Sequence, residues 1–112
     1  GSVLVSINGG VTWQGPAAGI PPEASVVALA VDHQDPDIVY AGSLENGVFV
    51  SLDGGASWKT LNDGLLNRAV RDLALSPDGT VLYMASEGAG VFRLGPPPLA
   101  YYLPVVTAPQ DE

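Results

Sequence analysis

His33 is the only histidine of the chain, and it stands among the carboxylates Asp32, Asp35 and Asp37. Carboxylate oxygens are the ligands that a hard cation such as calcium prefers, so this segment is a candidate cation site. The spacing of the three carboxylates matches no known calcium loop, and the corresponding segment in the second half of the chain, residues 76–79, reads Ser-Pro-Asp-Gly. A polar turn therefore explains the segment more simply than a metal site does.

The other reactive residue types form no recognisable active site. The chain has no cysteine, which excludes thiol nucleophiles, thiolate metal sites and disulfides. The sequence also contains no Ser-His-Asp arrangement, no glycine-rich phosphate loop and no metal-ligand spacing. We therefore predict a protein that is not an enzyme and that has no catalytic residue, no metal site and no cofactor.

Length and composition indicate a single β-rich folding unit. The 112 residues are enough for one domain and too few for two independent cores. Fourteen glycines and ten prolines beside 46% hydrophobic residues disfavour long helices and disorder. Twelve acidic and four basic residues give a net charge of -8, the wrong sign for binding nucleic acid. No apolar run approaches the roughly 20 residues that a membrane span needs, so we predict no membrane insertion.

An internal repeat organises the chain. An offset of 45 residues places residues 3–13 on residues 48–58, and the two segments match closely in residue type. With small gaps, the apolar run of residues 26–31 also falls on residues 70–75. A period near 45 residues is typical of a β-propeller blade or of another stacked β repeat.

Each period contains four predicted strands. Those of the central period cover residues 25–31, 38–43, 47–51 and 57–61. Residues 25–31 form a continuous apolar run, as expected of a strand that is buried on both faces. Asn46-Gly47 is typical of a tight hairpin turn, because both residue types tolerate the positive φ that this turn requires. Four antiparallel strands in one period are the content of a propeller blade.

Two segments of the repeat resemble the Asp-box (BNR) motif, whose form is Ser/Thr-x-Asp-x-Gly-x-Thr/Ser-Trp. The matching residues of the second copy are Ser51, Asp53, Gly55, Ser57 and Trp58. Those of the first copy are Ser6, Asn8, Gly10, Thr12 and Trp13, with asparagine in place of the aspartate. The motif occurs in sialidases, sortilin-type receptors and related β-propellers, and the resemblance covers roughly residues 1–94.

The resemblance implies architecture and not chemistry, because in these families the Asp box lies at the periphery of the propeller. A sialidase-like reaction would require an arginine triad, a Tyr–Glu nucleophile pair and an acid Asp, gathered from many blades around one axis. The arginines of this chain, Arg68, Arg71 and Arg93, fit no pattern that matches such a triad. We expect them to be surface charges, and we expect the Asp-box side chains to stabilise turns.

The order of the predicted strands leaves the blades incomplete. If the strands of one blade are labelled A to D, the chain reads C and D, then A to D, then A to C. The predicted strands outside the central blade cover residues 3–6, 12–15, 70–76, 81–85 and 90–94. About two and a half blades cannot close a propeller of roughly four to eight. We therefore predict an all-β fold of antiparallel four-stranded propeller-type blades, completed by neighbouring subunits.

The segment after the blades is predicted to be a separate tail. Residues 1–94 form the Asp-box repeat domain, and residues 95–112 begin with a stiff proline-rich spacer, Gly-Pro-Pro-Pro. An apolar, β-prone stretch follows the spacer and includes Tyr101, Tyr102, Leu103, Val105 and Val106. This stretch can complete the last blade of its own chain, or it can add to a neighbouring subunit as a donor strand.

Incomplete blades predict self-assembly, because unpaired strand edges and apolar faces associate in water. Unlike ends make the contact head to tail, which gives a closed ring or an open filament. We therefore expect a non-catalytic structural protein whose partner is itself. The alternative is a glycan- or protein-binding fragment of a larger Asp-box propeller, and a third interpretation is a designed or excised fragment. Since Asp-box proteins are mostly extracellular or periplasmic, the resemblance implies an extracellular or cell-surface location.

Overall fold

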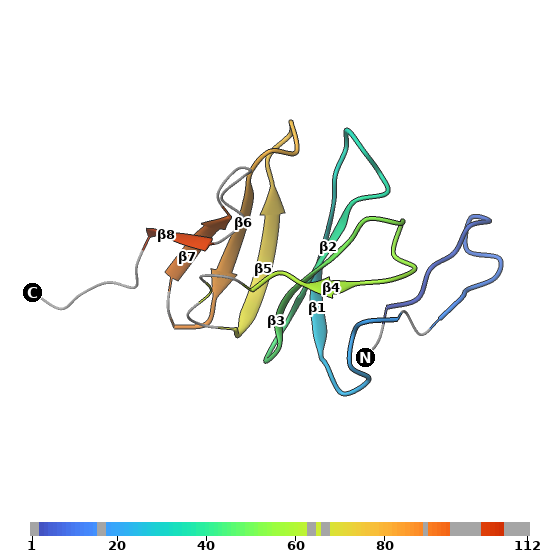
Figure 1. The fold of residues 1–112 in the computed structure, drawn as a ribbon, viewed down its shortest axis with the longest axis horizontal. Helices are drawn as coiled ribbons and strands as arrows, with labels where there is room; N and C mark the ends of the chain where they lie inside the picture. The colour runs from blue at the N-terminus through green and yellow to red at the C-terminus, as the bar shows by residue number, and fades with distance from the viewer. Residues whose placement is uncertain are drawn as a thin grey trace, which may run out of the picture.

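The computed structural model of the chain contains two antiparallel β-sheets that lie side by side (Figure 1). The structure describes residues 3–15, 18–62, 65, 68–88, 90–94 and 102–106. These residues include no helix, and therefore none that is long and apolar enough to cross a membrane. The predicted all-β class is confirmed for this part of the chain.

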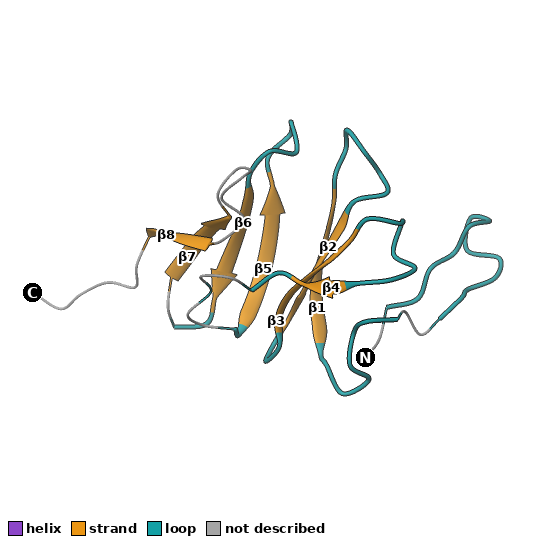
Figure 2. Cartoon of the chain, in the orientation of Figure 1, coloured by secondary structure: helices purple, strands orange, loops and turns teal. Residues whose placement is uncertain are grey.

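Each sheet is a meander in which strands that follow one another in sequence also pair. The first sheet, called sheet I, consists of β1 (Val26–Val31), β2 (Val39–Ser43), β3 (Gly47–Ser51) and β4 (Lys59–Thr60). The second sheet, called sheet II, consists of β5 (Val70–Leu75), β6 (Leu82–Ser86), β7 (Gly90–Leu94) and β8 (Tyr102–Val106). Turns and loops connect these strands (Figure 2).

The two sheets repeat one another in backbone structure as well as in sequence. The first strand of each sheet has a register shift near its start, between Val26 and Ala28 in β1 and between Val70 and Asp72 in β5. A bulge of this kind bends the strand locally and changes the twist of the sheet. Because the shift recurs at equivalent positions, the sequence repeat is also a repeat of conformation.

A hairpin turn connects β2 and β3 as predicted, but the turn covers residues 44–46, Asn46 has no positive φ, and Gly47 is the first residue of β3. Gly47 has a φ of 79°, which is the left-handed region that glycine adopts without strain. The ladder begins at the pair Ser43 and Gly47. The Ser43 hydroxyl donates to Gly47 O at 2.9 Å and accepts the Asn46 N–H at 3.0 Å, so a buried side chain fixes the turn.

Apolar side chains cover both faces of sheet I. Between the sheets, where β5 packs against β1 and β2, lies an inner cluster of Val48, Leu65, Val70, Leu73, Leu82, Met84 and Phe92. Ala28, Ala30 and Tyr40 of sheet I are half-buried against it. The opposite face of sheet I holds an outer cluster of Ile20, Ala24, Ala41, Phe49 and Trp58.

The prediction that residues 25–31 are buried on both faces is wrong. Half-buried and exposed residues alternate along β1, and Val27, Leu29 and Val31 are 46%, 56% and 45% exposed. Successive side chains of a strand point to opposite faces of its sheet. Leu29 pairs with Ala41, so its side chain points away from sheet II, where the described residues do not cover it.

The strands predicted between residues 3 and 15 are reduced to one isolated bridge, between Val5 and Gln14. Each of these residues donates its N–H to the carbonyl of the other, at 2.9 and 2.7 Å. A two-stranded hairpin is at best marginally stable in water, which explains the short ladder. In Figure 1 this segment lies on the side of sheet I that faces away from sheet II. The strand predicted over residues 57–61 is also shorter, since β4 has only two residues.

The tail completes its own sheet. β8 pairs antiparallel with β7 of the same chain, with Tyr102 opposite Leu94 and Leu103 opposite Arg93. Val105 and Val106 belong to the same strand, whereas Tyr101 lies outside the described residues. Exchange of this strand between neighbouring copies stays a prediction.

Candidate functional site

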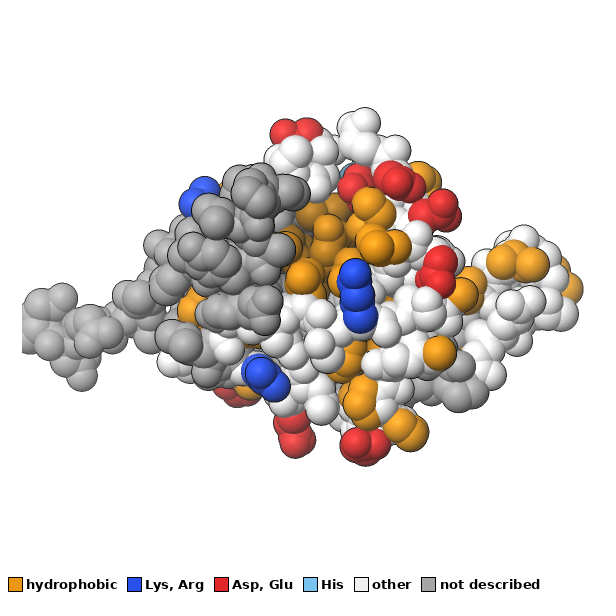
Figure 3. Space-filling model, viewed as in Figure 1, with side chains coloured by type: hydrophobic (Ala, Val, Ile, Leu, Met, Phe, Trp, Pro, Cys, Tyr) orange, Lys and Arg blue, Asp and Glu red, His pale blue; other side chains and the backbone are white. Residues whose placement is uncertain are grey.

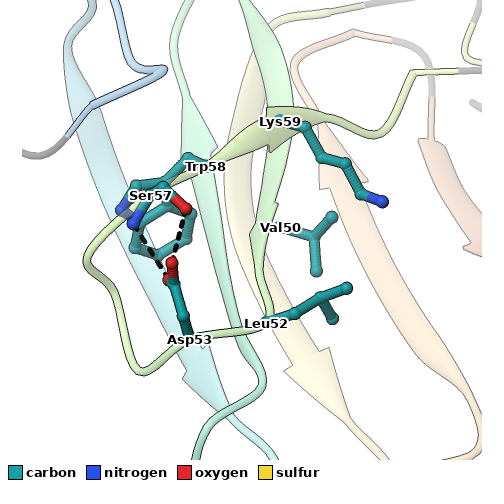
Figure 4. A pocket seen from close by; sticks show the side chains of 6 residues that line it. All are labelled: Val50, Leu52, Asp53, Ser57, Trp58 and Lys59. Carbon is teal, nitrogen blue, oxygen red and sulfur yellow. Dashed lines mark hydrogen bonds between the residues drawn. The ribbon is translucent and has the colours of Figure 1, made fainter.

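Residues 51–58, which we call the second Asp box because of their resemblance to that motif, form the turn between β3 and β4. The Ser51 hydroxyl donates to Asp53 Oδ1 at 2.7 Å and accepts the Gly55 N–H at 2.8 Å. The Asp53 carboxylate accepts both the backbone N–H and the hydroxyl of Ser57, as Figure 4 shows. Gly54 and Gly55 have φ values of 74° and 98°, which other residue types rarely adopt. The polar residues of the motif therefore bond to one another and close the turn.

The first Asp box makes the same contacts although Asn8 replaces the aspartate. The Ser6 hydroxyl donates to Asn8 Oδ1 at 3.0 Å and accepts the Gly10 N–H at 2.7 Å. Asn8 Oδ1 also accepts the Thr12 N–H at 2.9 Å. One bond is reversed in direction, because Asn8 Nδ2 donates to Thr12 Oγ1 at 2.7 Å, whereas the hydroxyl of the second box donates to its carboxylate. A hydroxyl can donate or accept, so either side chain closes the turn.

Hydrogen bonds in the second box stabilise the charged form of Asp53. The Ser57 hydroxyl has the largest effect, followed by the Ser57 N–H and the Ser51 hydroxyl, and together they lower the pKa of Asp53 to about 2. A general acid or base that works near neutral pH needs a pKa close to that pH. Asp53 is therefore suited to holding a turn and unsuited to acid–base catalysis.

The two Asp-box tryptophans differ in burial. Trp58 is 7% exposed, its indole N–H donates to Gly55 O at 2.9 Å, and its ring belongs to the outer cluster with Ala41 and Phe49. Trp13 is 60% exposed. The indole therefore packs against strands in the second box and not in the first, beside which the described residues place no sheet.

A third turn with the same chemistry was not predicted as an equivalent of the Asp boxes. In the connection between β5 and β6, the Ser76 hydroxyl donates to Asp78 Oδ1 at 2.7 Å, and the Thr80 hydroxyl donates to the same oxygen at 2.8 Å. These bonds, with that of Ser76 first, lower the pKa of Asp78. Ser76 and Asp78 have the same Ser-x-Asp spacing as Ser51 and Asp53, and this spacing could have indicated the turn from the sequence.

The sequence also gave no indication of the role of Asn62. Its Oδ1 accepts the Val48 N–H at 2.9 Å, and its Nδ2 donates to Asn46 O at 3.2 Å. The side chain thus ties the segment after β4 to the turn between β2 and β3. Its partners are 14 and 16 residues away in the chain, and no local pattern announces such a contact.

The segment around His33 is a polar turn, as the sequence predicts. Asp32 is 6% exposed, and its Oδ1 accepts the N–H groups of Gln34 at 2.8 Å and of Asp35 at 3.3 Å. The His33 side chain is exposed. Within the described ranges, no three His, Cys, Asp or Glu side chains are grouped so that they could hold a metal ion.

The three arginines are exposed, as expected of surface charges. Arg71 Nη1 lies 3.6 Å from Glu87 Oε2, and more than half of each side chain is exposed, at 57% and 61%. Exposed ion pairs of this kind stabilise a fold only slightly. Arg68 precedes β5, and Arg93 lies on β7 opposite Tyr83.

A hollow of about 200 Å³ lies beside the second Asp box and is lined by Val50, Leu52, Asp53, Ser57, Trp58 and Lys59. Figure 4 shows the side chains of Val50, Leu52 and Lys59 on one side of β3, with Asp53 and Ser57 on the other. The carboxylate is already engaged in the turn. The hollow therefore offers an apolar surface and one exposed ammonium group, without an acid–base pair.

Two apolar surfaces lie on the outer faces of the sheets. The outer face of sheet I, which points away from sheet II, exposes Val27, Leu29 and Val31. The outer face of sheet II surrounds a shallow hollow of about 180 Å³ whose lining includes Ala74, Tyr83, Ala85 and Val91. On the side of the molecule drawn in Figure 3, apolar side chains also reach the surface, and acidic side chains gather near its upper and lower rims.

Comparisons of the chain with protein-family models, with curated proteins and with solved structures found no match. The function must therefore be inferred from the geometry of the described residues. Their turn-forming polar groups bond to one another, whereas the apolar outer faces of the sheets are open to solvent. The outer faces thus expose apolar side chains that the described residues do not cover.

Proposed function

We propose that the chain is a non-catalytic structural protein. Its two sheets act as propeller-type blades that stack head to tail on those of neighbouring copies, in a closed ring or an open filament. The extracellular or cell-surface location that the Asp-box resemblance implies belongs to the same proposal. The support comes from the turns, which engage the polar groups, and from the outer faces, which remain apolar and exposed.

The observation that carries the proposal is a difference in burial between two equivalent leucines. Leu73 of β5 is 8% exposed because sheet I covers it, whereas Leu29 of β1 is 56% exposed. Both occupy the same place in their sheets, since Leu29 pairs with Ala41 and Leu73 pairs with Met84. Burying a leucine side chain stabilises a protein by roughly 1.5–3 kcal/mol. A sheet that covers Leu29 would therefore bind with a favourable contribution from this residue.

The outer face of sheet II has the side chains that such a covering sheet needs. In sheet I, the side chains of the paired residues Ala30 and Tyr40 pack against the inner cluster. The matching pair of sheet II, Ala74 and Tyr83, lies on its outer face. A second copy can therefore place this pair over Leu29 in the way that sheet I covers the inner cluster. Because the two surfaces in contact differ, the copies join head to tail.

The variant Leu29→Asp tests this contact, and Leu52→Asp is the matched control. Leu52 is 58% exposed, about as much as Leu29, and its side chain lies beside Lys59 and away from the outer cluster. We expect multimers for the native chain and for Leu52→Asp, and a monomer near 11.5 kDa for Leu29→Asp. An aspartate in the contact would lose its hydration without gaining a partner. Light scattering on a sizing column measures the mass of each protein.

Two results would contradict the proposal. A native chain that remains a monomer at every accessible concentration would exclude self-assembly and favour the alternative, a glycan- or protein-binding fragment of a larger propeller. Equal masses of the native chain and of a folded Leu29→Asp variant would mean that the contact between copies lies elsewhere. Circular dichroism of both variants establishes that they are folded.

A further inference from the structure

Residues 3–15 correspond in the sequence repeat to β3, the turn after it and β4. In the 45-residue repeat, Val5 and Gln14 correspond to Val50 and Lys59. Val5 and Gln14 form a bridge, and Val50 and Lys59 are a pair between β3 and β4. The segment is therefore the second half of a sheet whose other two strands are not among the described residues.

Contacts with sheet I hold this half-sheet in place. Val3 packs against the outer cluster. Val5 Cγ2 lies next to Gly55 of sheet I's Asp-box turn, where an added Cβ would meet it at 2.9 Å. The half-sheet therefore contacts sheet I through Val3 and Val5, while the side chains of Leu4 and Trp13 remain 51% and 60% exposed.

The place of the two further strands is bordered by defined groups. Val50 pairs with Lys59 on one side and with Tyr40 on the other. Val5 pairs with Gln14, and no described residue bonds to its strand on the opposite edge. We use the term seat for the unpaired edge of residues 3–6 together with the exposed side chains of Trp13, Leu29 and Val31.

We propose that the seat binds a two-stranded antiparallel β-hairpin with the side-chain pattern of β1 and β2. This inference rests on the proposed stacking of blades and adds a second occupant, a hairpin that competes with another copy of the chain for Leu29. The second strand of the hairpin pairs with residues 3–6, as β2 pairs with β3. Its small side chains and its tyrosine cover Leu29 and Val31, as Ala30 and Tyr40 cover the inner cluster.

The same hairpin accounts for the exposed indole of the first Asp box. Trp58 is buried with Ala41 of β2 and Phe49 of β3. Leu4 corresponds to Phe49 in the repeat, and the hairpin supplies the counterpart of Ala41. Trp13 therefore gains the neighbour that it lacks, and its indole becomes buried when the seat is filled.

A two-stranded hairpin fits the seat more completely than sheet II of a second copy does. In sheet II, β7 is paired with β6 and β8 with β7, so the sheet has four strands. Residues 3–15 already hold the places that correspond to the last two strands. A copy therefore covers Leu29 only at the side of β5 and β6, whereas a hairpin fills the seat without displacing residues 3–15. The hairpin competes with the contact between copies.

The first experiment titrates a synthetic peptide with the sequence of residues 25–44 into the full chain. This peptide contains no tryptophan, and Trp58 is already buried, so a change in fluorescence reports Trp13. We expect a saturable blue shift at one peptide per chain and a fall in the mass of any multimer. A Trp13→Phe chain should lose the shift and still bind the peptide in a calorimetric titration.

Matched variants locate the binding site. A peptide in which Ala30 and Tyr40 are both replaced by aspartate should bind about tenfold more weakly or worse, because its inward face is no longer apolar. Leu29→Asp in the chain should weaken binding of the native peptide similarly, and Leu52→Asp should not. Equal affinity of the native peptide for the Leu29→Asp chain and for the native chain would contradict the proposal that the hairpin covers Leu29.

An isolated hairpin is only marginally stable, so the free peptide can fail to bind because it is unfolded. A hairpin fused to the chain removes this ambiguity. An additional copy of residues 25–47 placed directly before Val3 reproduces the natural connection between Gly47 and Val48. We expect the emission of Trp13 to shift to the blue and the amides of residues 3–6 to become protected from hydrogen exchange. The same fusion with aspartate at the two inward positions should show neither effect. A native fusion that leaves Trp13 exposed would overturn the inference.

The inference and the proposed function fail differently. If the chain forms multimers but Trp13 responds neither to the peptide nor to the fused hairpin, the proposed assembly is supported and the hairpin site is contradicted. If the chain is a monomer that binds the hairpin, the hairpin site is supported and assembly with its own copies is contradicted.

Discussion

An aspartate and an asparagine close the same turn in the two Asp boxes. Asp53 and Asn8 each use Oδ1 to accept a hydroxyl and a backbone N–H. The second atom of the side chain accepts in one box and donates in the other, and the hydroxyl opposite adapts to both. The turn therefore needs a short side chain with one oxygen acceptor, and the negative charge is not essential to its geometry.

The charge nevertheless makes the second box sensitive to acid. The pKa of Asp53 is lowered to about 2 in the fold, whereas an aspartate in an unfolded chain has a pKa of about 3.9. Because the folded pKa is the lower one, the stabilisation is complete above about pH 4 and is lost as the pH falls toward 2. Asp78, whose pKa is also lowered, acts in the same direction. Urea unfolding at a series of pH values should show this loss.

Asp53→Asn is the control for the acid effect, because Asn8 makes the same turn without a charge. The variant should fold, and its free energy of unfolding should change less between about pH 4 and pH 2 than that of the native chain. If both proteins lose the same free energy in this range, other carboxylates cause the acid sensitivity.

Among the elements, the strands beside each Asp box decide what its tryptophan contributes. The turn itself is nearly the same in both copies, but Trp58 lies on sheet I and Trp13 lies on an isolated pair of segments. An indole that is enclosed by strands stabilises the fold through burial, and an indole in solvent does not.

The replacement of each tryptophan by alanine tests this difference. Trp58→Ala should lower the free energy of unfolding by about 3–5 kcal/mol, as large-to-small changes in a core do. Trp13→Ala should change it by about 0.5 kcal/mol or less, since the side chain is exposed. Denaturant titrations at low protein concentration, where copies are apart, measure both values. Equal losses would mean that Trp13 is buried in solution.

For the whole molecule, the net charge of -8 opposes the contact that we propose between copies. Like-charged copies repel, and salt screens this repulsion over a distance of about 8 Å at physiological ionic strength. An apolar contact between outer faces is itself little weakened by moderate salt. The balance between repulsion and burial therefore depends on ionic strength.

We expect the mean mass of the native chain to rise with salt at a fixed protein concentration. Light scattering in buffers of low and moderate ionic strength measures this change, and Leu29→Asp should remain a monomer in both. A mean mass that falls as salt is added would contradict the expectation, because it would indicate that ion pairs hold the copies together.

The repeat, the Asp-box turns and the hairpin at Asn46-Gly47 could be predicted because they depend on residues close together in the chain. Glycine is needed where φ is positive, and a serine two residues before an aspartate reaches its carboxylate within one turn. The strand predicted over residues 47–51 agrees with β3 for the same reason, since a turn at each end fixes its limits.

Burial and strand exchange could not be predicted, because they depend on which sheet lies next to a strand. The apolar patterns of β1 and β5 are alike, yet Leu73 is covered by sheet I and Leu29 is covered by no described sheet. The tail could pair within or between chains, and its register with β7 places it in its own sheet. Contacts between distant segments have no local signature, so packing in three dimensions, and not residue pattern, separates the buried faces of this protein from its exposed ones.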